Sequence, residues 1–344
     1  SPDVKTMIHR FAKISMIGAS TRIENAVLTD AEVDWMDTVL TQDGRVTAFD
    51  TKKAMIENKL SKDRERSIEE VAGCRNMLEI IYNEAQDCLP LTETLLRGLH
   101  NELMRFYPAA QNYSGSYKTA PNSVVSTNHH TGESHTVFKT ADAGPITDAA
   151  MRDLIDWYNQ CYQNNMATLP IACEFTYRFL AIHPFQDGNG RLGRGIFLLL
   201  LLQSPEITVA KMSPYLPIDR HIEKRKSQYY TVLNRCSGGV YAHDPSSYHI
   251  EYFLKFMIDV LSDALDDVKL YKEKCDRYYT LSKAALKILA CFKEHPEVRL
   301  SAQELITMTK LARRTVTYSL NTLNEAHFIQ KYGRAAGTRY QLIF

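Results

Sequence analysis

The side chains best suited to chemistry in this chain lie in one run of twelve residues, His183-Pro-Phe-Gln-Asp-Gly-Asn-Gly-Arg-Leu-Gly-Arg194. His183 has an imidazole whose ordinary pKa is near neutrality, which suits a general base. Asp187 offers the carboxylate oxygen that Mg²⁺ takes beside phosphate groups. Gly188 and Gly190 allow the backbone to approach an anion closely. These residue types predict a site that handles the phosphates of a nucleotide.

The element that must position this site is the apolar run that follows it, Leu192–Leu202, which we expect to be a buried helix. The first N–H groups of a helix lack partners within it and attract an anion. Arg191 and Arg194, three residues apart, would share one face of the first turn and grip phosphate oxygens. The alternative is a capped surface turn with solvated arginines. The accompanying His and Asp favour the phosphate site.

The twelve residues match the signature His-x-Phe-x-(Asp/Glu)-Gly-Asn-Gly-Arg-x-x-Arg at every defining position, and the chain resembles the Fic family over residues 10–265 or so. Most Fic proteins transfer AMP from ATP to a hydroxyl of a target protein, although some transfer phosphate or phosphocholine instead. The resemblance implies these roles: His183 deprotonates the target Ser, Thr or Tyr hydroxyl; Asp187 holds Mg²⁺ against the α- and β-phosphates; Gly188, Asn189 and Gly190 form the anion hole; Arg191 contacts the outer phosphates; Arg194 holds the γ-phosphate; Phe185 packs in the core.

One region breaks an otherwise helical pattern, between Tyr113 and Thr140, where Gly, Ser, Thr, Val and Asn dominate. Two extended runs, at Val124–Val125 and His135–Lys139, flank a predicted hairpin turn at Asn128–Gly132. In Fic proteins a β-hairpin flap at this place aligns the target peptide by strand addition. The resemblance assigns that role here to Thr136, Val137, Phe138 and Lys139.

Two further patterns in this part of the chain allow alternatives. His129 and His130 are adjacent in a polar turn, which is more typical of solvated side chains than of a metal site. The run Gly115-Ser-Tyr-Lys118 resembles the family's Gly-x-Tyr-Arg, with Lys118 in place of the usual arginine.

Downstream, Tyr229 and Tyr230 resemble the aromatic pair that lines the adenine pocket of Fic proteins, and Ser237 falls where relatives place a polar contact to the nucleotide. Tyrosines in a helix also pack against neighbours for structural reasons alone. The two readings of the tyrosine pair stay open at this stage.

Near the N-terminus, Ser20-Thr-Arg-Ile-Glu24-Asn25 fits the family's inhibitory pattern (Ser/Thr)-x-x-x-Glu-(Gly/Asn). By itself, Ser and Glu four residues apart is typical of any solvated helix face. Beside the signature, it implies an inhibitory helix whose Glu24 carboxylate pairs with Arg194 and repels the γ-phosphate. In some relatives the same Glu supports removal of AMP from the target.

The last part of the chain, from Leu281 onward, has a different charge. It holds ten Lys and Arg against four Glu, so it is near +6 while the rest of the chain is near −5. Helices at 281–294, 301–308 and 311–326, followed by strands at 328–331 and 339–343, resemble a winged helix-turn-helix. Lys310, Arg313, Arg314 and Thr315 would open its recognition helix, with Arg334 at the wing tip. DNA binding and a docking or dimerisation role both remain open.

The expected fold is therefore mainly α: helical residues 1–60 with the inhibitory motif, an all-helical Fic core with one β-hairpin at 61–275, and a small winged helix at 280–344. Other expected helices lie at about 67–87, 92–106, 147–165, 170–182, 190–204, 219–236 and 247–275.

The composition argues against some classes of function but does not identify one. The net charge of +1 gives no general attraction to nucleic acid or membrane, and no signal peptide or membrane span is visible. Seven scattered cysteines predict free thiols in a reducing cytoplasm. The leading hypothesis is an autoinhibited protein adenylyltransferase that uses ATP and Mg²⁺ on a target protein and on itself. The alternatives are transfer of another phosphate-containing group, and a DNA-binding regulator whose Fic core senses nucleotide. The sequence also leaves open whether the protein forms a homodimer.

Overall fold

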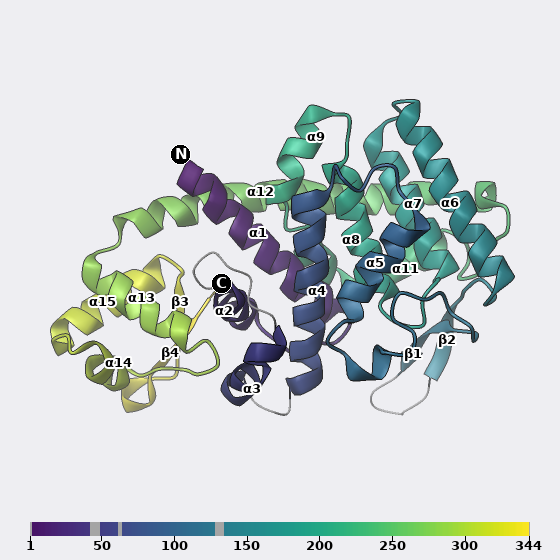
Figure 1. Ribbon diagram of the computed structural model, residues 1–344. Coiled ribbons are helices and arrows are strands. Elements are labelled where there is room, and N and C mark those ends of the chain that lie inside the picture. Colours follow the sequence, from purple (N-terminus) through teal and green to yellow (C-terminus); the bar gives the residue numbers. More distant parts are fainter. Residues whose placement is uncertain (1, 42–48, 61–63, 128–133, 344) are drawn as a thin grey trace.

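The computed structural model describes the backbone of residues 2–41, 49–60, 64–127 and 134–343, and their side chains except at 2, 123–137 and 336 (Figure 1). The chain is mainly helical, and no described helix is long and apolar enough to cross a membrane. The helices are α1 (Pro2–Ile23), α2 (Asp30–Leu40), α3 (Phe49–Leu60), α4 (Glu65–Glu84), α5 (Glu93–Met104), α6 (Pro145–Gln163), α7 (Thr168–Ile182), α8 (Asn189–Leu202), α9 (Ile207–Met212), α10 (Ile218–Lys224), α11 (Lys226–Arg235), α12 (Ile250–Thr280), α13 (Lys283–Glu294), α14 (Ala302–Thr309) and α15 (Arg313–Glu325). The strands are β1 (Ser123–Thr127), β2 (Ser134–Lys139), β3 (Ile329–Tyr332) and β4 (Arg339–Leu342).

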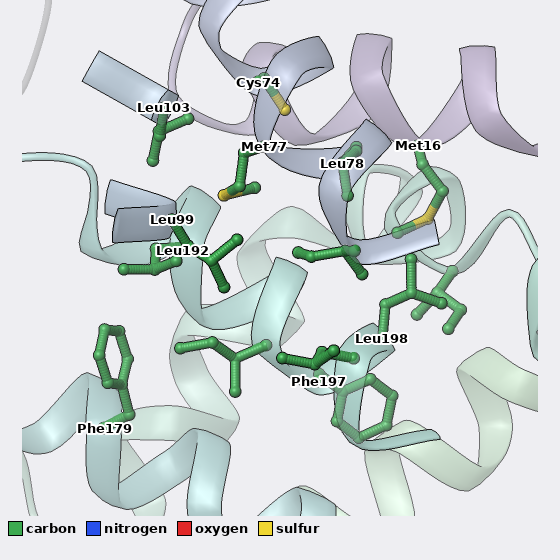
Figure 2. Close-up of a cluster of buried hydrophobic side chains, with 14 of the residues drawn as sticks. Met16, Cys74, Met77, Leu78, Leu99, Leu103, Phe179, Leu192, Phe197 and Leu198 are labelled. Carbon is green, nitrogen blue, oxygen red and sulfur yellow. The ribbon is translucent and has the colours of Figure 1, made fainter. Parts of the chain in front are cut away.

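Helix α8 is the centre of the main hydrophobic core, as its apolar sequence predicts. From Arg191 to Leu202 every residue is buried. Figure 2 shows Phe197 and Leu198 of this helix among side chains from α4, α5 and α7, including Met77 and Phe179. A helix surrounded in this way cannot shift or tilt without opening the core. The residues at its N-terminus are therefore held in fixed positions.

Helix α1 packs into the same core, so the N-terminal region is not a separate layer. Ile14 and Ile17 are fully buried, and α1 packs against α4, α10 and α12. The Ser15 hydroxyl also lies 3.1 Å from the Tyr271 hydroxyl of α12. In Figure 1, α1 crosses the molecule between α12 and α4 and ends beside the base of α8. The packing along most of α1 thus fixes the position of the residues that follow its C-terminal end.

Two differences from the expected helices have local causes. The helix expected at 219–236 is two helices, α10 and α11, because Arg225 leaves the helical conformation at φ −118° and ψ 30°. Neither Pro nor Gly marks that break, so it could not be predicted from the residue types there. Helix α2 was not expected, although Thr29 and Glu32 form a capping box at its start.

The expected β-hairpin is present as the antiparallel pair β1–β2. Val124 pairs with Phe138 and Val125 with Thr136, so Val137 is the extra residue of a bulge. Bulges bend a strand and redirect its side chains. Lys139 is also bonded on its other side, since its N–H donates to Gly239 O at 2.8 Å and its carbonyl accepts from Tyr241 N at 2.8 Å. The predicted turn at 128–132, with both adjacent histidines, lies outside the described residues.

Beyond α12, helices α13–α15 and the antiparallel pair β3–β4 form a small module around a hydrophobic cluster of its own. Its fully buried members include Ile288, Phe292, Leu305, Val316 and Leu323. In Figure 1 this module lies at the end of the molecule remote from the β1–β2 hairpin.

Candidate active site

His183 ends helix α7 in the left-handed conformation, at φ 54° and ψ 57°. This conformation is uncommon for a residue with a side chain, and it turns the chain sharply toward α8. His183 Nδ1 lies 3.2 Å from Leu180 O, so Nδ1–H donates there and Nε2 is left to accept a proton. Burial lowers the pKa of His183 to about 4. The imidazole is therefore neutral at pH 7, as a general base must be.

The loop between His183 and α8 is closed by a side chain that bonds backbone in both directions. Asn189 Oδ1 accepts from Phe185 N at 2.9 Å, and Asn189 Nδ2 donates to Phe185 O at 2.7 Å. The Phe185 ring is fully buried and anchors the loop from below. Gly188 completes the turn at φ 80°, a value that suits glycine. The Asn189 side chain is thus hydrogen-bonded within the loop. An anion would therefore be bound by the backbone at the start of α8.

His100 of α5 supports the same loop, although the sequence analysis did not single it out. Its Nδ1 accepts from Gly115 N at 2.9 Å, and its Nε2 lies 2.9 Å from Asp187 O. Its ring stacks on Phe185 with a centroid distance of 3.9 Å. Because one nitrogen accepts and the other donates, the ring must be neutral, and burial lowers the pKa of His100 to about 4. The sequence feature that could have identified His100 is a histidine on the apolar face of a predicted helix.

Asp187, in the loop just before α8, faces Arg191 on the first turn of that helix. Arg191 Nη2 lies 3.4 Å from Asp187 Oδ1, and Arg191 Nη1 lies 3.8 Å from Glu70 Oε1 of α4. Arg191 Nε is buried and has no hydrogen-bond partner among the described residues. The arginine is therefore held near the loop by two acids, with part of its donor capacity unused.

The Asp187 carboxylate is a candidate for Mg²⁺, and the donor set around it bears on that assignment. Its side chain is 38% exposed and lines the cavity described below. No group of three His, Cys, Asp or Glu able to hold a metal occurs in the described part of the chain. Mg²⁺ is commonly held by one or two carboxylates, with water and substrate phosphates completing its shell. A single Asp fits an ion that arrives with a nucleotide.

Arg194, one turn further along α8, is 3% exposed and contacts the N-terminal region. Its Nε donates to Ser20 Oγ at 3.2 Å, and its Nη2 donates to Ser20 O and Glu24 Oε1, both at 2.9 Å. Asp219 Oδ2 of α10 lies 3.5 Å from Arg194 Nε. The guanidinium is thus enclosed by groups that stand far apart in the sequence.

Glu24 follows the last turn of α1 and reaches over the start of α8. Its Cδ would lie 3.1 Å from a Cβ built on Gly190, with the carboxylate oxygen closer still. The glycine at this position therefore makes room for the carboxylate. Asn25 turns the chain away at φ 74°, and its Oδ1 accepts from Lys226 Nζ at 3.1 Å. Only Gly and a few polar residues such as Asn take this conformation readily, which explains the residue types found after such a Glu.

One cavity of about 190 Å³ is bordered by His183, Asp187, Arg191, Arg194 and Glu24. Tyr229 and Tyr230 of α11 line it, with ring centroids 5.4 Å apart. Leu233 and Asn234 line it as well, and they were missed, although Asn234 shares a helix face with Tyr230 four residues earlier. The lining is Glu24, Phe138, Tyr177, Leu180, Ala181, His183, Gln186, Asp187, Gly188, Asn189, Gly190, Arg191, Arg194, Tyr229, Tyr230, Leu233 and Asn234. The lining combines charged groups with aromatic and aliphatic ones, a combination that would suit a nucleotide.

Some of the predicted site residues are placed elsewhere. Ser237 does not line the cavity, and its Oγ accepts from the Tyr177 hydroxyl at 2.7 Å. Lys139 has an exposed side chain outside the cavity. Thr136 and Val137 are placed in β2 by their backbone, and their side chains are outside the described set. Ser20 lies behind Arg194 rather than on the cavity wall.

Lys118 ties the base of the hairpin to the end of α7. Its Nζ donates to Asn122 Oδ1 at 2.8 Å, Thr140 Oγ1 at 3.1 Å and Ile182 O at 2.9 Å. Asn122 Nδ2 in turn donates to Phe185 O at 2.8 Å. Lys118 therefore fills a structural role in which its three donors are used, and burial lowers the pKa of Lys118 to about 8.

Comparison with known proteins agrees with this geometry. Residues 90–201 match the model of the Fic/DOC family, and this range contains the loop, α7 and α8. Residues 90–201 form a Fic domain. A curated relative from Drosophila willistoni, named protein adenylyltransferase Fic, is 27% identical over 118 residues, which make up 34% of this chain and 20% of that protein. The match thus spans about a fifth of the length of the relative.

Solved structures extend the likeness of the Fic domain to the surrounding helices. A Fic domain containing signaling protein from Bacteroides thetaiotaomicron is 26% identical, with a TM-score of 0.56 over 79% of this chain and 90% of that chain. A Fic family protein from Desulfovibrio desulfuricans is 24% identical, with a TM-score of 0.54 over 97% of this chain and 87% of that chain. The second likeness concerns the fold alone.

Proposed function

We propose that this chain is a protein adenylyltransferase that moves AMP from ATP to a Ser, Thr or Tyr hydroxyl of a target protein and of itself. The observation that carries the proposal is the convergence, in one cavity, of a neutral His183, the start of helix α8 and Arg194. The name of the Drosophila willistoni relative supports the same reaction. The match to the Fic family supports transfer by this domain.

In the proposed reaction, His183 Nε2 takes the proton of the target hydroxyl. The hydroxyl oxygen attacks the α-phosphorus of ATP, the bond between that phosphorus and the bridging oxygen breaks, and pyrophosphate leaves. His183 then holds the proton that the hydroxyl lost. The hydrogen bond from Nδ1 to Leu180 O at 3.2 Å fixes the ring in the orientation that this transfer needs.

The phosphates would lie against the N-terminus of α8. The backbone of Gly188, Asn189 and Gly190 borders this point, with the Gly188 N–H donating to Asp187 Oδ1 at 2.5 Å, and Arg191 and Arg194 flank it. Fixed dipoles and guanidinium groups lower the energy of the charge that develops on the phosphates. Asp187 would hold Mg²⁺ against them, and the bound ion would neutralise part of that charge.

The remaining parts of the cavity and its border fit the nucleoside and the target. Tyr229 and Tyr230 would contact the adenine ring through their faces. The target segment would pair with the outer edge of β2 over Thr136, Val137 and Phe138, with Lys139 at its end. Ser237 would act on the nucleotide through Tyr177, since its hydroxyl accepts a hydrogen bond from that side chain.

Glu24, with Ser20 and Asn25, would keep the enzyme inactive. Its carboxylate occupies one Arg194 nitrogen at 2.9 Å and places a negative charge where the γ-phosphate would lie. ATP bound beside it would be displaced, and in-line attack fails when the reacting atoms are misplaced.

In the proposed enzyme, residues 61–275 carry out catalysis and residues 1–60 inhibit it. We assign residues 280–344 to a winged helix, because three helices and a two-stranded sheet enclose one small core there. The described cysteines are all free, which fits a reducing compartment such as the cytoplasm.

The test is intact mass after incubation with Mg²⁺ and ATP, comparing wild type, Glu24→Gly, and Glu24→Gly with His183→Ala. The expected result is an added AMP in the single variant only. Lys211→Gly, at an exposed position on α9, is the matched control and should behave as wild type. No adduct in Glu24→Gly, with ATP shown to bind, would refute the proposal. An added phosphate in place of AMP would assign a different transferred group.

A further inference from the structure

The C-terminal module presents a helix face that the transfer reaction does not use. Helix α15 buries Val316, Leu320 and Leu323 against α13 and α14. Its opposite side leaves a stripe exposed at i, i+4 and i+7, formed by Arg314, Tyr318 and Asn321. Tyr318 is 72% exposed, the largest fraction among the exposed large hydrophobic residues.

Positive charge is concentrated around this stripe, on two elements. Lys310 and Arg313 lie at the turn before α15 and at its start, and both are exposed. Lys331 and Arg334 are exposed on and after β3. Arg314 and these four side chains form no ion pair with any residue that the structure describes. Glu297, an acid of the same module, instead pairs with Lys59 of α3 at 3.0 Å.

We propose that this surface binds duplex DNA, with α15 in the major groove and the β3–β4 turn on the adjacent phosphate backbone. Helix α15 has 13 residues, so it is about 20 Å long, and an α-helix fits a major groove about 12 Å wide. In helix-turn-helix proteins the second helix of the motif enters the groove, and its first residues meet base edges. The turn between α14 and α15, with Lys310 in the left-handed conformation at φ 56°, places α15 as that second helix.

The chemistry of this face favours DNA over a protein or an RNA partner. The centre of a protein interface is depleted in charge, whereas Lys310 in the turn before α15 and Arg313 and Arg314 at its start are all cations, and the sequence has no Asp or Glu from Lys310 to Asn324. The major groove of duplex RNA is too deep and narrow for a helix to read. A guanidinium pairs with guanine and a carboxamide with adenine, so Arg314 and Asn321 have base partners in duplex DNA.

Binding here would leave the Fic cavity open. The module stands at the end of the molecule remote from the β1–β2 hairpin, and none of its residues lines the cavity (Figure 1). This inference is therefore independent of the transfer reaction and can hold or fail without it.

The test is fluorescence anisotropy of a labelled 30-base-pair duplex of mixed sequence, titrated with the full chain at several salt concentrations. We expect wild type to bind, with affinity falling steeply with salt. In Arg313→Glu/Arg314→Glu, affinity at low salt should fall on the order of tenfold or more, with a smaller salt slope. The control Lys211→Glu/Lys255→Glu makes the same change in net charge at exposed positions on α9 and α12, and should bind as wild type.

Three outcomes would overturn the proposal: no binding by wild type at low salt, equal loss in the control, or preference for RNA of the same length. Unchanged circular dichroism would show that the reversed variant is folded. Selection from a random duplex library adds a second measure. Wild type should enrich a motif, and Asn321→Ala should relax the preference at one position, an effect that a purely structural role would not produce. Enrichment of no motif by wild type would contradict base reading by α15.

Discussion

Arg194 Nη2 and Glu24 Oε1 lie 2.9 Å apart, although 170 residues separate them in the sequence. The guanidinium is almost fully buried, and Ser20 and Asp219 also contact it. Burial of an ion is costly unless it is paired, so the arginine requires such partners. The pair therefore contributes to the packing of α1 on α8 and, in the proposed enzyme, competes directly with substrate.

The charge of Glu24 and the space it fills can be separated by two substitutions. Glu24→Gly removes both, and it should raise self-modification roughly 10- to 100-fold, the equivalent of one charge-assisted hydrogen bond. Glu24→Gln keeps an acceptor for Arg194 without the charge, so its rate should fall between those of wild type and Glu24→Gly. Initial rates from intact mass would measure this order. Equal rates in all three proteins would contradict the inhibitory role.

Asp219 should make the stability of the fold depend on pH. Burial raises the pKa of Asp219 from 3.8 to about 6. The native state therefore binds more protons than the unfolded state between these values, and its stability falls as pH rises from about 4 to about 6. Asp219→Asn removes this dependence. Urea unfolding of both proteins should show the advantage of wild type shrinking by roughly 2 kcal/mol across the window. A difference in unfolding free energy between the two proteins that does not change with pH would contradict this prediction.

His100 should matter for both stability and loop geometry. His100→Phe keeps a ring over Phe185 but leaves Gly115 N and Asp187 O without their partner, which should cost roughly 2–4 kcal/mol. His243 is an exposed histidine whose ring contacts Tyr241 at 5.3 Å, and His243→Phe is the matched control. Thermal unfolding should separate the two variants clearly. A similar small effect in both would show that the His100 bonds are unimportant.

Two glycines in neighbouring helices should respond to alanine in opposite directions. A Cβ on Gly73 of α4 would strike Leu103 O and lie 2.9 Å from Leu103 C of α5. Because backbone cannot move aside cheaply, Gly73→Ala should destabilise by roughly 1–3 kcal/mol. A Cβ on Gly98 of α5 meets no described atom within 4 Å, so Gly98→Ala should stabilise by roughly 0.5–1 kcal/mol. Denaturant midpoints measure both, and loss of stability in Gly98→Ala would contradict the second expectation.

The expected helices were mostly right where periodicity was strong and bounded by punctuation. Helices α4–α8 and α13–α15 lie within a few residues of the expected ranges. The break at Arg225 was not predicted because the residues before and after it all have helical propensity. It lies at a tertiary contact, the ion pair of Arg225 with Asp263 of α12. His100 was missed for a related reason, since its partners, Gly115 and Asp187, are brought to it only by folding.

By itself, the sequence determined the local chemistry: a neutral base, a carboxylate, glycines and arginines at fixed spacing before an apolar helix, and a second short pattern at Ser20–Asn25. These are properties of residue type and of contacts along a few turns, so they can be inferred without a fold. Only the tertiary structure decided what those groups meet. The packing of α1 across the core brings Glu24 over Gly190, the Asn189 side chain turns inward to Phe185, and Ser237 is drawn to Tyr177. Contacts between distant segments depend on how side chains fill a shared core, and neighbouring residues do not encode that packing.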